Sequence, residues 1–363
     1  NPCLFGVPVR VWPRAPHKVN KMKKVIVTGG SGFIGSNLIK FLIKKKYQVV
    51  NIDKLTYSAN SYNLKDISKN KNYFFIKSNI SNKKKISKIL IKHKPVAIFN
   101  LAAETHVDRS IDNPENFIKT NILAVYNFLS VVRDYVKKSN KKIKFIHVST
   151  DEVYGDVTKG RSTEDSSYKP NSPYSASKAS ADHIINSFIK TYNFPAIISN
   201  CCNNYGPNQF PEKLIPKIIF SAINNKPLIV YGKGENSREW IHVKDHCEAL
   251  YKILKSGKIG ETYNVGTGHD LKNIILVKKL LKITKLNLSS LGKNVKIKFV
   301  QDRPGHDSRY ALDSKKISNE LKWKAKININ LGLVKTVNWY LNNKSYFTSI
   351  PKKFINTRLG LKK

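Results

Sequence analysis

Cysteine is scarce in this sequence of 363 residues. The four cysteines are Cys3, Cys201, Cys202 and Cys247, and their spacing matches neither a disulfide framework nor a set of metal ligands. Adjacent Cys201 and Cys202 cannot form an ordinary bridge, so we expect them to pack in the core. The scarcity excludes a disulfide-stapled secreted scaffold and favours the reducing environment of the cytoplasm.

Long hydrophobic runs are absent as well. No segment approaches the roughly 18–20 consecutive apolar residues that a membrane span needs, so we expect no membrane association. Residues 1–21, which precede the single methionine Met22, contain prolines and show no helical period. They have neither the apolar core of a secretion signal nor the Ser and Arg richness of a transit peptide. We interpret them as a non-native or disordered extension, with the native start at Met22.

Negative charge is in short supply. Asp and Glu total 24 against 65 Lys and Arg, which gives a formal net charge of +41. Such an excess can neutralise the phosphates of a nucleic acid. The excess is mostly lysine, however, and the lysines are scattered over the sequence instead of gathering with aromatic residues. We therefore favour a solvated lysine-rich surface over nucleic-acid binding, and this field could still steer an anionic substrate.

A glycine-rich turn follows the first predicted strand. Val25–Val27 is a short apolar run, and Gly29, Gly32 and Gly35 separate it from a helical pattern. Glycines at this spacing allow a tight turn and a close approach of the backbone to a pyrophosphate at the helix N-terminus. A second predicted strand ends at Asp53, which can accept hydrogen bonds from ribose hydroxyls and so favours NAD over NADP. The alternative for Asp53 is a helix-capping role.

Strand and helix patterns continue to alternate through the first half of the chain. After the second strand, at 49–52, further strands are predicted at 73–76, 96–101, 145–149 and 196–199. This alternation predicts an α/β fold with a doubly wound parallel sheet of the Rossmann type, which binds ligands at the carboxyl ends of its strands. Residues 114–138 have the period of an amphipathic helix, whose apolar positions can serve both the core and a dimer interface.

The composition shifts toward prolines and short segments from about residue 200. We therefore predict a smaller, discontinuous C-terminal substrate domain. The dinucleotide-binding domain is expected to span 22–199, with returning segments near 237–272 and 326–346, and the substrate domain to span 200–236 and 273–325.

Five polar side chains are predicted to meet in one cleft. The strand at 145–149 delivers Thr150, Asp151 and Glu152, and a helix that continues to about residue 192 carries Tyr174 and Lys178 on one face, one turn apart. A hydroxyl, two carboxylates, a phenol and an ammonium together suit proton removal, proton donation and hydride chemistry in one pocket.

Four side chains in the second half of the chain are predicted to form a cationic lid on a diphosphate. They are Lys213, Arg238, Arg303 and His306. The planar guanidinium of arginine can engage phosphate oxygens in pairs. A surface salt bridge is the alternative for each of them. The Pro and Gly of D-R-P-G-H-D indicate a shaped loop around Arg303 and His306, which favours the binding role there.

The motifs now form a recognisable series between Met22 and Asn343. In order, the chain contains T-G-G-S-G-F-I-G, D-K-L-T-Y, L-A-A-E-T-H-V-D-R-S-I, S-T-D-E-V-Y-G, S-P-Y-S-A-S-K-A, N-N-Y-G-P, F-P-E-K-L-I-P, Y-G-K-G and D-R-P-G-H-D. The sequence resembles the dTDP-glucose 4,6-dehydratases, extended short-chain dehydrogenases/reductases of nucleotide-sugar metabolism. The T-D-E triplet is the most specific element, because related epimerases and decarboxylases generally lack an Asp-Glu pair there.

The resemblance implies a redox-neutral dehydration of dTDP-glucose to dTDP-4-keto-6-deoxyglucose with tightly bound NAD+. Tyr174 would take the proton of the C4 hydroxyl, with Lys178 favouring the phenolate, and Thr150 would hydrogen-bond the C4 oxygen. Glu152 would remove the C5 proton, and Asp151, kept protonated, would protonate the leaving C6 hydroxyl.

The resemblance also implies two sets of binding residues. The NAD set is Gly29, Gly32, Phe33, Ile34, Gly35, Asp53, Lys54, Leu55, Thr56, Asn79, Ile80, Leu101, Ala102, Ala103, Thr120, Tyr174, Lys178 and Asn204. The substrate set is Thr105, Thr150, Asn203, Lys213, Leu214, Tyr231, Arg238, Asn273, Arg303 and His306. Asn79 departs from the family, which usually has aspartate against the adenine amino group. Asparagine keeps an acceptor oxygen, so we expect NAD binding to survive.

Several alternatives stay open from the sequence. The substrate can be a UDP- or GDP-hexose instead of the thymidine compound. A 4-epimerase would share Tyr174, Lys178 and the glycine turn but would have no use for Asp151 and Glu152. A decarboxylase would need a uronic acid, and a polyanion-binding basic protein would hold no NAD. The resembled family is commonly homodimeric, and the helices near 114–138 and 174–192 fit such an interface.

Overall fold

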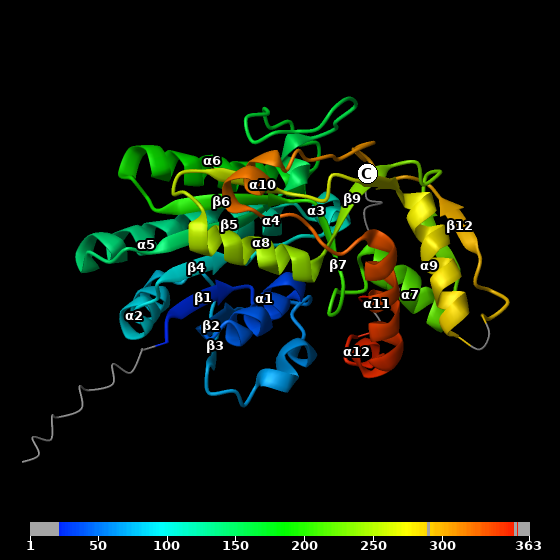
Figure 1. Cartoon of the computed structure of the whole chain (residues 1–363), viewed down its shortest axis with the longest axis horizontal. Helices are drawn as coiled ribbons and strands as arrows, with labels where there is room; N and C mark the ends of the chain where they lie inside the picture. Colours follow the sequence, from blue (N-terminus) through cyan, green and yellow to red (C-terminus); the bar gives the residue numbers. More distant parts are fainter. Residues whose placement is uncertain (1–21, 289–290, 352–353, 355–363) are drawn as a thin grey trace, which may run out of the picture.

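The computed structural model describes residues 22–288, 291–351 and 354. The predicted N-terminal extension, with Cys3, lies outside these residues. Within them the chain forms two lobes, with the large sheet and its helices in one and α7, α9, α11 and α12 in the other (Figure 1). None of the helices in this described part combines the length and the apolar character that crossing a bilayer requires.

Seven parallel strands form the large sheet, in the order β10-β6-β5-β4-β1-β2-β3. Successive side chains of a strand point to opposite faces of the sheet. In β1, Val25 and Val27 accordingly join one buried apolar cluster and Ile26 joins the other. The predicted doubly wound parallel sheet is confirmed. Its strands are β1 Lys24–Thr28, β2 Gln48–Asp53, β3 Tyr73–Lys77, β4 Ala97–Asn100, β5 Lys144–Thr150, β6 Ala196–Cys201 and β10 Thr262–Val265.

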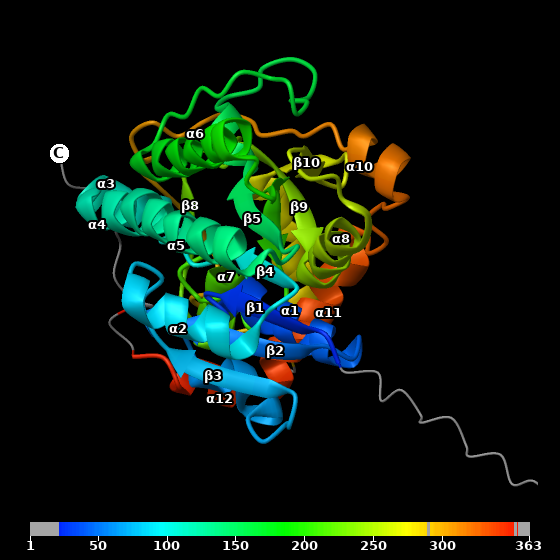
Figure 2. The ribbon, with the colours of Figure 1, turned by 90° about the vertical axis from the view of Figure 1, so that its left-hand side faces the viewer.

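Helices cover both faces of this sheet (Figure 2). Their apolar residues recur at helical spacing, and each set packs on one of the two buried clusters. One face holds α1 (Phe33–Lys44), α8 (Val243–Ser256) and α10 (Lys315–Leu321), and the other holds α2 (Lys83–His93), α5 (Ala124–Ser139) and α6 (Pro173–Tyr192).

The predicted regular helix over 114–138 is interrupted. A short helix, α4 (Glu115–Phe117), leads into a π-helical segment, η2 (Ile118–Leu123), which continues into α5. The wider turn holds the buried Asn121 side chain, which accepts from Glu104 N (2.9 Å) and donates to Glu104 O (3.0 Å) and to Ser177 Oγ (2.9 Å). π-helical turns inside α-helices are frequent at functional sites, and here the hydrogen bonds of Asn121 hold the loop that follows β4 in place.

The second lobe has its own apolar core. This core joins α7, β8, α9, α11 and α12, and includes Ile215, Leu276 and Val337. The elements are β7 (Asn203–Tyr205), α7 (Leu214–Ile223), β8 (Leu228–Tyr231), β9 (Ser237–His242), β11 (Asp270–Lys272), α9 (Asn273–Asn287), β12 (Ile297–Val300), α11 (Ile329–Asn342) and α12 (Lys344–Thr348).

The segments 237–272 and 326–346 were predicted to return to the dinucleotide-binding domain, and the structure packs parts of both elsewhere. Within 237–272, α8 and β10 do return to the large sheet, but β9 and β11 form a separate three-stranded sheet with β7. The helix within 326–346, α11, packs in the second lobe because its apolar side chains complete that core. The domain boundaries as a whole stay a prediction.

Candidate active site

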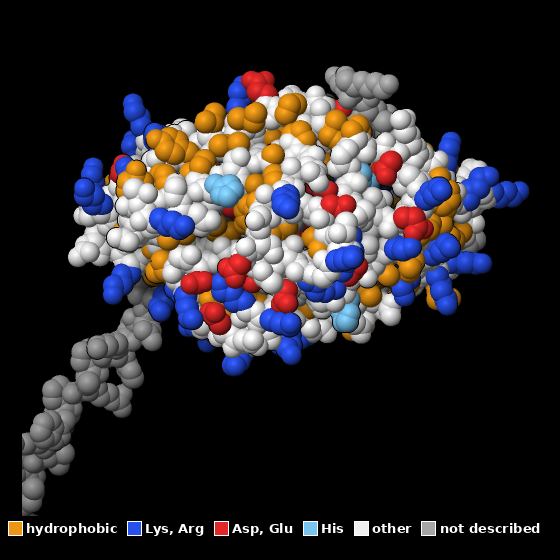
Figure 3. All heavy atoms as spheres, turned by 90° about the horizontal axis from the view of Figure 1, so that it is seen from above, with side chains coloured by type: hydrophobic (Ala, Val, Ile, Leu, Met, Phe, Trp, Pro, Cys, Tyr) orange, Lys and Arg blue, Asp and Glu red, His pale blue; other side chains and the backbone are white. Residues whose placement is uncertain are grey.

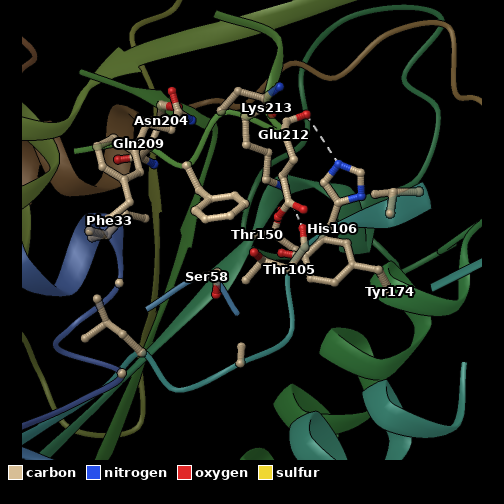
Figure 4. Close-up of a pocket in the computed structure, with 18 of the residues that line it drawn as sticks. Phe33, Ser58, Thr105, His106, Thr150, Tyr174, Asn204, Gln209, Glu212 and Lys213 are labelled. Carbon is tan, nitrogen blue, oxygen red and sulfur yellow. Dashed lines mark hydrogen bonds between the residues drawn. The ribbon is translucent and has the colours of Figure 1, made fainter. Parts of the chain in front are cut away.

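A cavity of about 400 Å³ lies between the two lobes and is lined from both (Figure 4). It opens at the carboxyl ends of β1, β4 and β5, where a parallel sheet of this kind binds ligands. Every residue predicted to bind cofactor or substrate lines it, with the exception of Leu55. Thr150, Glu152, Tyr174 and Lys178 line it as well, whereas Asp151 does not.

One end of the cavity is built by the glycine turn. Gly29 has φ +66°, and a Cβ there would lie 2.8 Å from the backbone nitrogen of Ala102. Helix α1 begins directly after Gly32, and no side chain of the described residues caps its N-terminus. The turn therefore exposes backbone N–H groups beside a strand end that only glycine can approach so closely, which suits a pyrophosphate.

Replacing Gly29 with alanine should destabilise the protein and empty the cofactor site. The matched control is Gly160→Ala, because Gly160 has φ +68° but a Cβ added there would meet no described atom within 4 Å. Both variants bear the left-handed backbone strain of about 1–2 kcal/mol, and only Gly29→Ala adds the clash with Ala102. Melting temperature and the NAD released on denaturation measure the difference, and equal NAD content in the two variants would contradict it.

Asp53 is buried at the end of β2 and already anchored. Its Oδ2 accepts from Ser31 N (2.9 Å) and its Oδ1 from Leu55 N (2.8 Å). Burial raises the pKa of Asp53, and these two N–H groups and Lys54 oppose that rise. Each oxygen keeps a further lone pair for a ribose hydroxyl. Leu55 takes part through its backbone, since its side chain is exposed.

Asn79, the departure from the family, lines the same end of the cavity. Its Oδ1 accepts from Ser81 N at 3.0 Å. An amide oxygen has two lone pairs, so this contact orients Asn79 and still leaves an acceptor for an amino group.

The Thr150-Asp151-Glu152 triplet lies where β5 ends and the short helix η3 (Asp151–Tyr154) begins. Thr150 Oγ1 donates to Asp151 Oδ1 (3.2 Å) and accepts from Glu152 N (3.3 Å). Asp151 is 2% exposed, and its Oδ2 has no hydrogen-bond partner among the described residues. The triplet thus places Glu152 on the cavity wall and Asp151 directly beside it.

The carboxyl groups of Asp151 and Glu152 lie in different electrostatic surroundings, as the predicted acid and base roles would need. The pKa of Asp151 is raised well above its usual value by burial and by the charges of Glu152 and Glu239. Burial also raises the pKa of Glu152, but Arg303 and the other cations around it oppose the rise. Asp151 is therefore the better candidate for the protonated member and Glu152 for the ionised one.

Tyr174 and Lys178 are held on α6 by a capped helix start. Ser172 caps the helix through Ser175 N, and Pro173 occupies its first turn. Burial, and then the charge of Glu152, raises the pKa of Tyr174 well above its usual value, and a hydrogen bond with the Thr150 side chain opposes this.

The described contacts of Lys178 run to the sheet instead of to Tyr174. Its Nζ donates to Val148 O (2.8 Å) and lies 3.1 Å from His147 Nε2. His147 Nδ1 lies 3.0 Å from Asn100 Nδ2. Burial lowers the pKa of Lys178 and of His147. His147 was not predicted from the sequence as part of the site. Its position in the same strand, three residues before Thr150, could have indicated that it lies close to the site.

The opposite end of the cavity is cationic. Arg303 donates from an NH group to Asp108 Oδ1 (2.9 Å), and Tyr231 donates to Asp108 Oδ2 (2.9 Å). Arg303 Nε is buried and has no partner in the described part of the chain. Lys213 donates to Thr105 O (2.6 Å). The pairing leaves a buried guanidinium donor beside the cavity, as an anionic ligand would need.

Arg238 and His306 also line this end. Arg238 is held by three backbone carbonyl groups, those of Ser237, Asp307 and Ser308. His306 contacts Asp302 at 2.6 Å, and burial lowers the pKa of His306 to about 4. The histidine is thus a neutral hydrogen-bonding group at neutral pH instead of the predicted cation.

Cys201 and Cys202 are buried as predicted, and they line the cavity too. Other lining residues that the sequence analysis missed are Ser58, His106, Asp108, Gln209, Phe210, Glu212 and Tyr310. Several of them lie inside the sequence motifs quoted above, such as H-V-D and F-P-E-K, so those motifs could have identified them as cavity residues.

Comparisons with known proteins agree on the kind of protein. The family model described as GDP-mannose 4,6 dehydratase matches residues 26–336. A probable dTDP-glucose 4,6-dehydratase of Sinorhizobium fredii is 44% identical, over 93% of this chain and 99% of that protein.

Solved structures of a dehydratase and of an epimerase have the same fold as this chain. A dTDP-glucose 4,6-dehydratase of Streptomyces venezuelae, crystallised with NAD bound, is 38% identical with a TM-score of 0.82, over 89% of this chain and 98% of that one. A UDP-glucose 4-epimerase of Thermotoga maritima is 28% identical with a TM-score of 0.79, over 88% and 99%.

Proposed function

This chain belongs to the dTDP-glucose 4,6-dehydratase family, and from that premise we propose how its own residues carry out the reaction. The chain is an NAD-dependent hydro-lyase that dehydrates dTDP-glucose to dTDP-4-keto-6-deoxyglucose in deoxysugar biosynthesis. The observation that carries this assignment is the end of β5, where Thr150 and Glu152 line one cavity together with Tyr174 and the buried Asp151 lies between them in the chain.

The glycine-turn end of the cavity fits NAD. A Cβ at Gly29 would fill the space against Ala102, and the anchored Asp53 offers oxygens to ribose hydroxyls. When bound, NAD supplies the acceptor for the C4 hydride and its return to C6. We assign the pyrophosphate to the α1 N-terminus and the adenosine ribose to Asp53.

The first half of the reaction needs a base at the C4 hydroxyl. We assign this proton to the Tyr174 oxygen, and the Thr150 hydroxyl holds the C4 oxygen beside it. Lys178, buried one helical turn along, favours the phenolate through its charge.

The second half needs an acid and a base on adjacent carbons. The new C4 ketone acidifies the C5 proton, which Glu152 removes as the ionised carboxylate on the cavity wall. Asp151 then protonates the C6 hydroxyl, so that water leaves, and Glu152 returns a proton to C5. The buried Asp151 Oδ2, which has no partner among the described residues, is the atom we assign to the C6 hydroxyl.

The cationic end is assigned to the diphosphate. Arg303 and Lys213 face the cavity from the second lobe, whereas Gly29 and Asp53 face it from the first. We therefore propose that the first lobe binds the cofactor and the second binds the nucleotide sugar. The lysine-rich exterior, spread over the visible face among acidic groups (Figure 3), is consistent with electrostatic steering of this anionic substrate.

The test of the function is incubation with dTDP-glucose, UDP-glucose and GDP-mannose, with products identified by mass. Loss of one water from dTDP-glucose with no change in net oxidation state is the expected result. Interconversion of C4 epimers would assign the site to another reaction.

A homodimer is also proposed. Exposed apolar side chains gather on the helices predicted to form an interface, Ile118 and Leu123 on η2, Tyr126 on α5 and Tyr192 on α6. Light scattering should give twice the mass of one chain. We further propose a cytoplasmic setting, because Cys201, Cys202 and Cys247 are all free thiols.

A further inference from the structure

The two cations assigned to the diphosphate, Arg303 and Lys213, are held at the cavity in different ways. Arg303 is fixed through its side chain by Asp108. Lys213 lies at the end of a loop, residues 206–213, which joins β7 to α7 without regular secondary structure. Loops move more than the elements they connect unless other segments hold them. The position of Lys213 therefore depends on what holds this loop.

Glu212, the residue before Lys213, carries the contacts that hold the loop. Its side chain is 5% exposed, and its two carboxylate oxygens have partners from distant segments. Oε1 accepts from the hydroxyl of Tyr57 (3.0 Å), in the loop after β2, and Oε2 accepts from Arg109 Nε (2.9 Å), in α3 (Val107–Asp112). Hydrogen bonds between arginine and a carboxylate are stronger than neutral ones. The Glu212 side chain thus joins the loop before α7 to the segments that follow β2 and β4.

The partners of Glu212 also contact one another. The Arg109 guanidinium carbon lies 3.9 Å from the centroid of the Tyr57 ring, within the range of a cation–π interaction. Burial lowers the pKa of His106 to about 4, so its ring is neutral at neutral pH. His106 Nδ1 accepts from Arg109 N (3.4 Å), which leaves the ring hydrogen on Nε2, 3.4 Å from Glu212 O (Figure 4). Both the side chain and the main chain of Glu212 therefore meet the same short segment.

Only part of this group of residues can touch a ligand. Glu212 and Lys213 line the cavity, whereas Tyr57 and Arg109 are not among the described residues that line it. Lys213 Nζ donates to Thr105 O (2.6 Å), and an ammonium has three donor positions, so two of them stay available to a ligand. Tyr57 and Arg109 can accordingly affect a ligand only through the loop that they hold.

We propose that Tyr57 and Arg109 are positioning residues for Lys213. By holding Glu212 they fix the loop that places the Lys213 ammonium against the diphosphate of the nucleotide sugar. Tyr57 comes four residues after Asp53, so the same contact joins the cofactor end of the cavity to its substrate end. The inference rests on the proposed function, which assigns the diphosphate to Lys213.

The experiment measures the binding of thymidine diphosphate to the holoenzyme by calorimetry. Tyr57→Phe removes the hydroxyl that donates to Glu212 and keeps the ring against Arg109, so the Kd should rise about tenfold. With dTDP-glucose, KM should rise more than kcat falls, because the lost contact serves binding. Tyr62→Phe is the matched control, since Tyr62 donates to the equally distant Asn343 (3.0 Å) and is not among the described cavity residues. It should leave the Kd unchanged.

A double-mutant cycle with Lys213→Met separates positioning from a general loosening of the fold. Lys213→Met alone should weaken the binding of thymidine diphosphate. Adding Tyr57→Phe to it should change the Kd by less than about twofold, because the hydroxyl acts through the ammonium that is already gone.

Three results would overturn the inference. They are an unchanged Kd in Tyr57→Phe, an equal rise of the Kd in Tyr62→Phe, and an effect of Tyr57→Phe that persists in full in the Lys213→Met background. Failure of the proposed function is a separate observation, because the wild-type enzyme would then form no 4-keto-6-deoxy product from dTDP-glucose.

Discussion

Replacing Asp151 with asparagine is expected to stop water loss while C4 oxidation continues. The amide cannot donate the proton that the C6 hydroxyl needs, so dehydration should fall by about 10²–10⁴-fold. Reduced cofactor should then accumulate on the enzyme, which its near-ultraviolet absorbance reports, while a mass measurement of the sugar reports the missing water.

The pH dependence follows from the direction of the Asp151 shift. Its pKa is raised well above the usual value, chiefly by burial, so the acid form persists at neutral pH. Dehydration should decline as the pH rises through that pKa, and the Asn variant should lack this decline. Asp156→Asn is the control, since Asp156 lies nearby but hydrogen-bonds Ser308 at the surface. Dehydration at near wild-type rate in Asp151→Asn would remove Asp151 from the acid role.

The second large effect is expected for Glu152→Gln. Glutamine cannot remove the C5 proton, so the overall rate should fall by about 10²–10⁴-fold. In deuterated water the wild-type product should carry deuterium at C5, because Glu152 takes a proton from C5 and can exchange it before returning it. The sugar recovered from Glu152→Gln should carry none, which NMR or mass spectrometry measures.

Glu164→Gln is the matched control for this change. Glu164 is a partly buried carboxylate that accepts from Asn264 N (2.8 Å), and it does not line the cavity. It should dehydrate and exchange at the wild-type rate. Deuterium at C5 in the Glu152→Gln product would mean that another group serves as the base.

The two variants also separate this reaction from its relatives. A 4-epimerase needs the phenol and the glycine turn but neither carboxyl group. Loss of product in both variants, with C4 oxidation retained in Asp151→Asn, would therefore tie the triplet to water elimination. Retained turnover in both would point to epimerisation.

Much of this protein was determined by its sequence alone. The glycine turn, Asp53 and the Thr150-Asp151-Glu152 triplet are local features, because each depends on a strand end and the few residues after it. Alternating apolar runs predicted the parallel sheet for the same reason, since the period of a strand or helix shows in its own residues. The binding residues followed from motifs within such segments, and nearly all of them line one cavity.

Tertiary structure alone decided what depends on distant segments. Asp108 accepts a hydrogen bond from Arg303, which lies 195 positions away in the sequence, and no local sequence pattern predicts this pairing. The hydrogen bonds of Asn121 to Glu104, the exclusion of β9 from the large sheet and the burial of Asp151 next to the cavity are of the same kind. Hydrogen bonds and burial of this sort arise only when separate elements pack together, and it is that packing which sets the charge state of each carboxyl group.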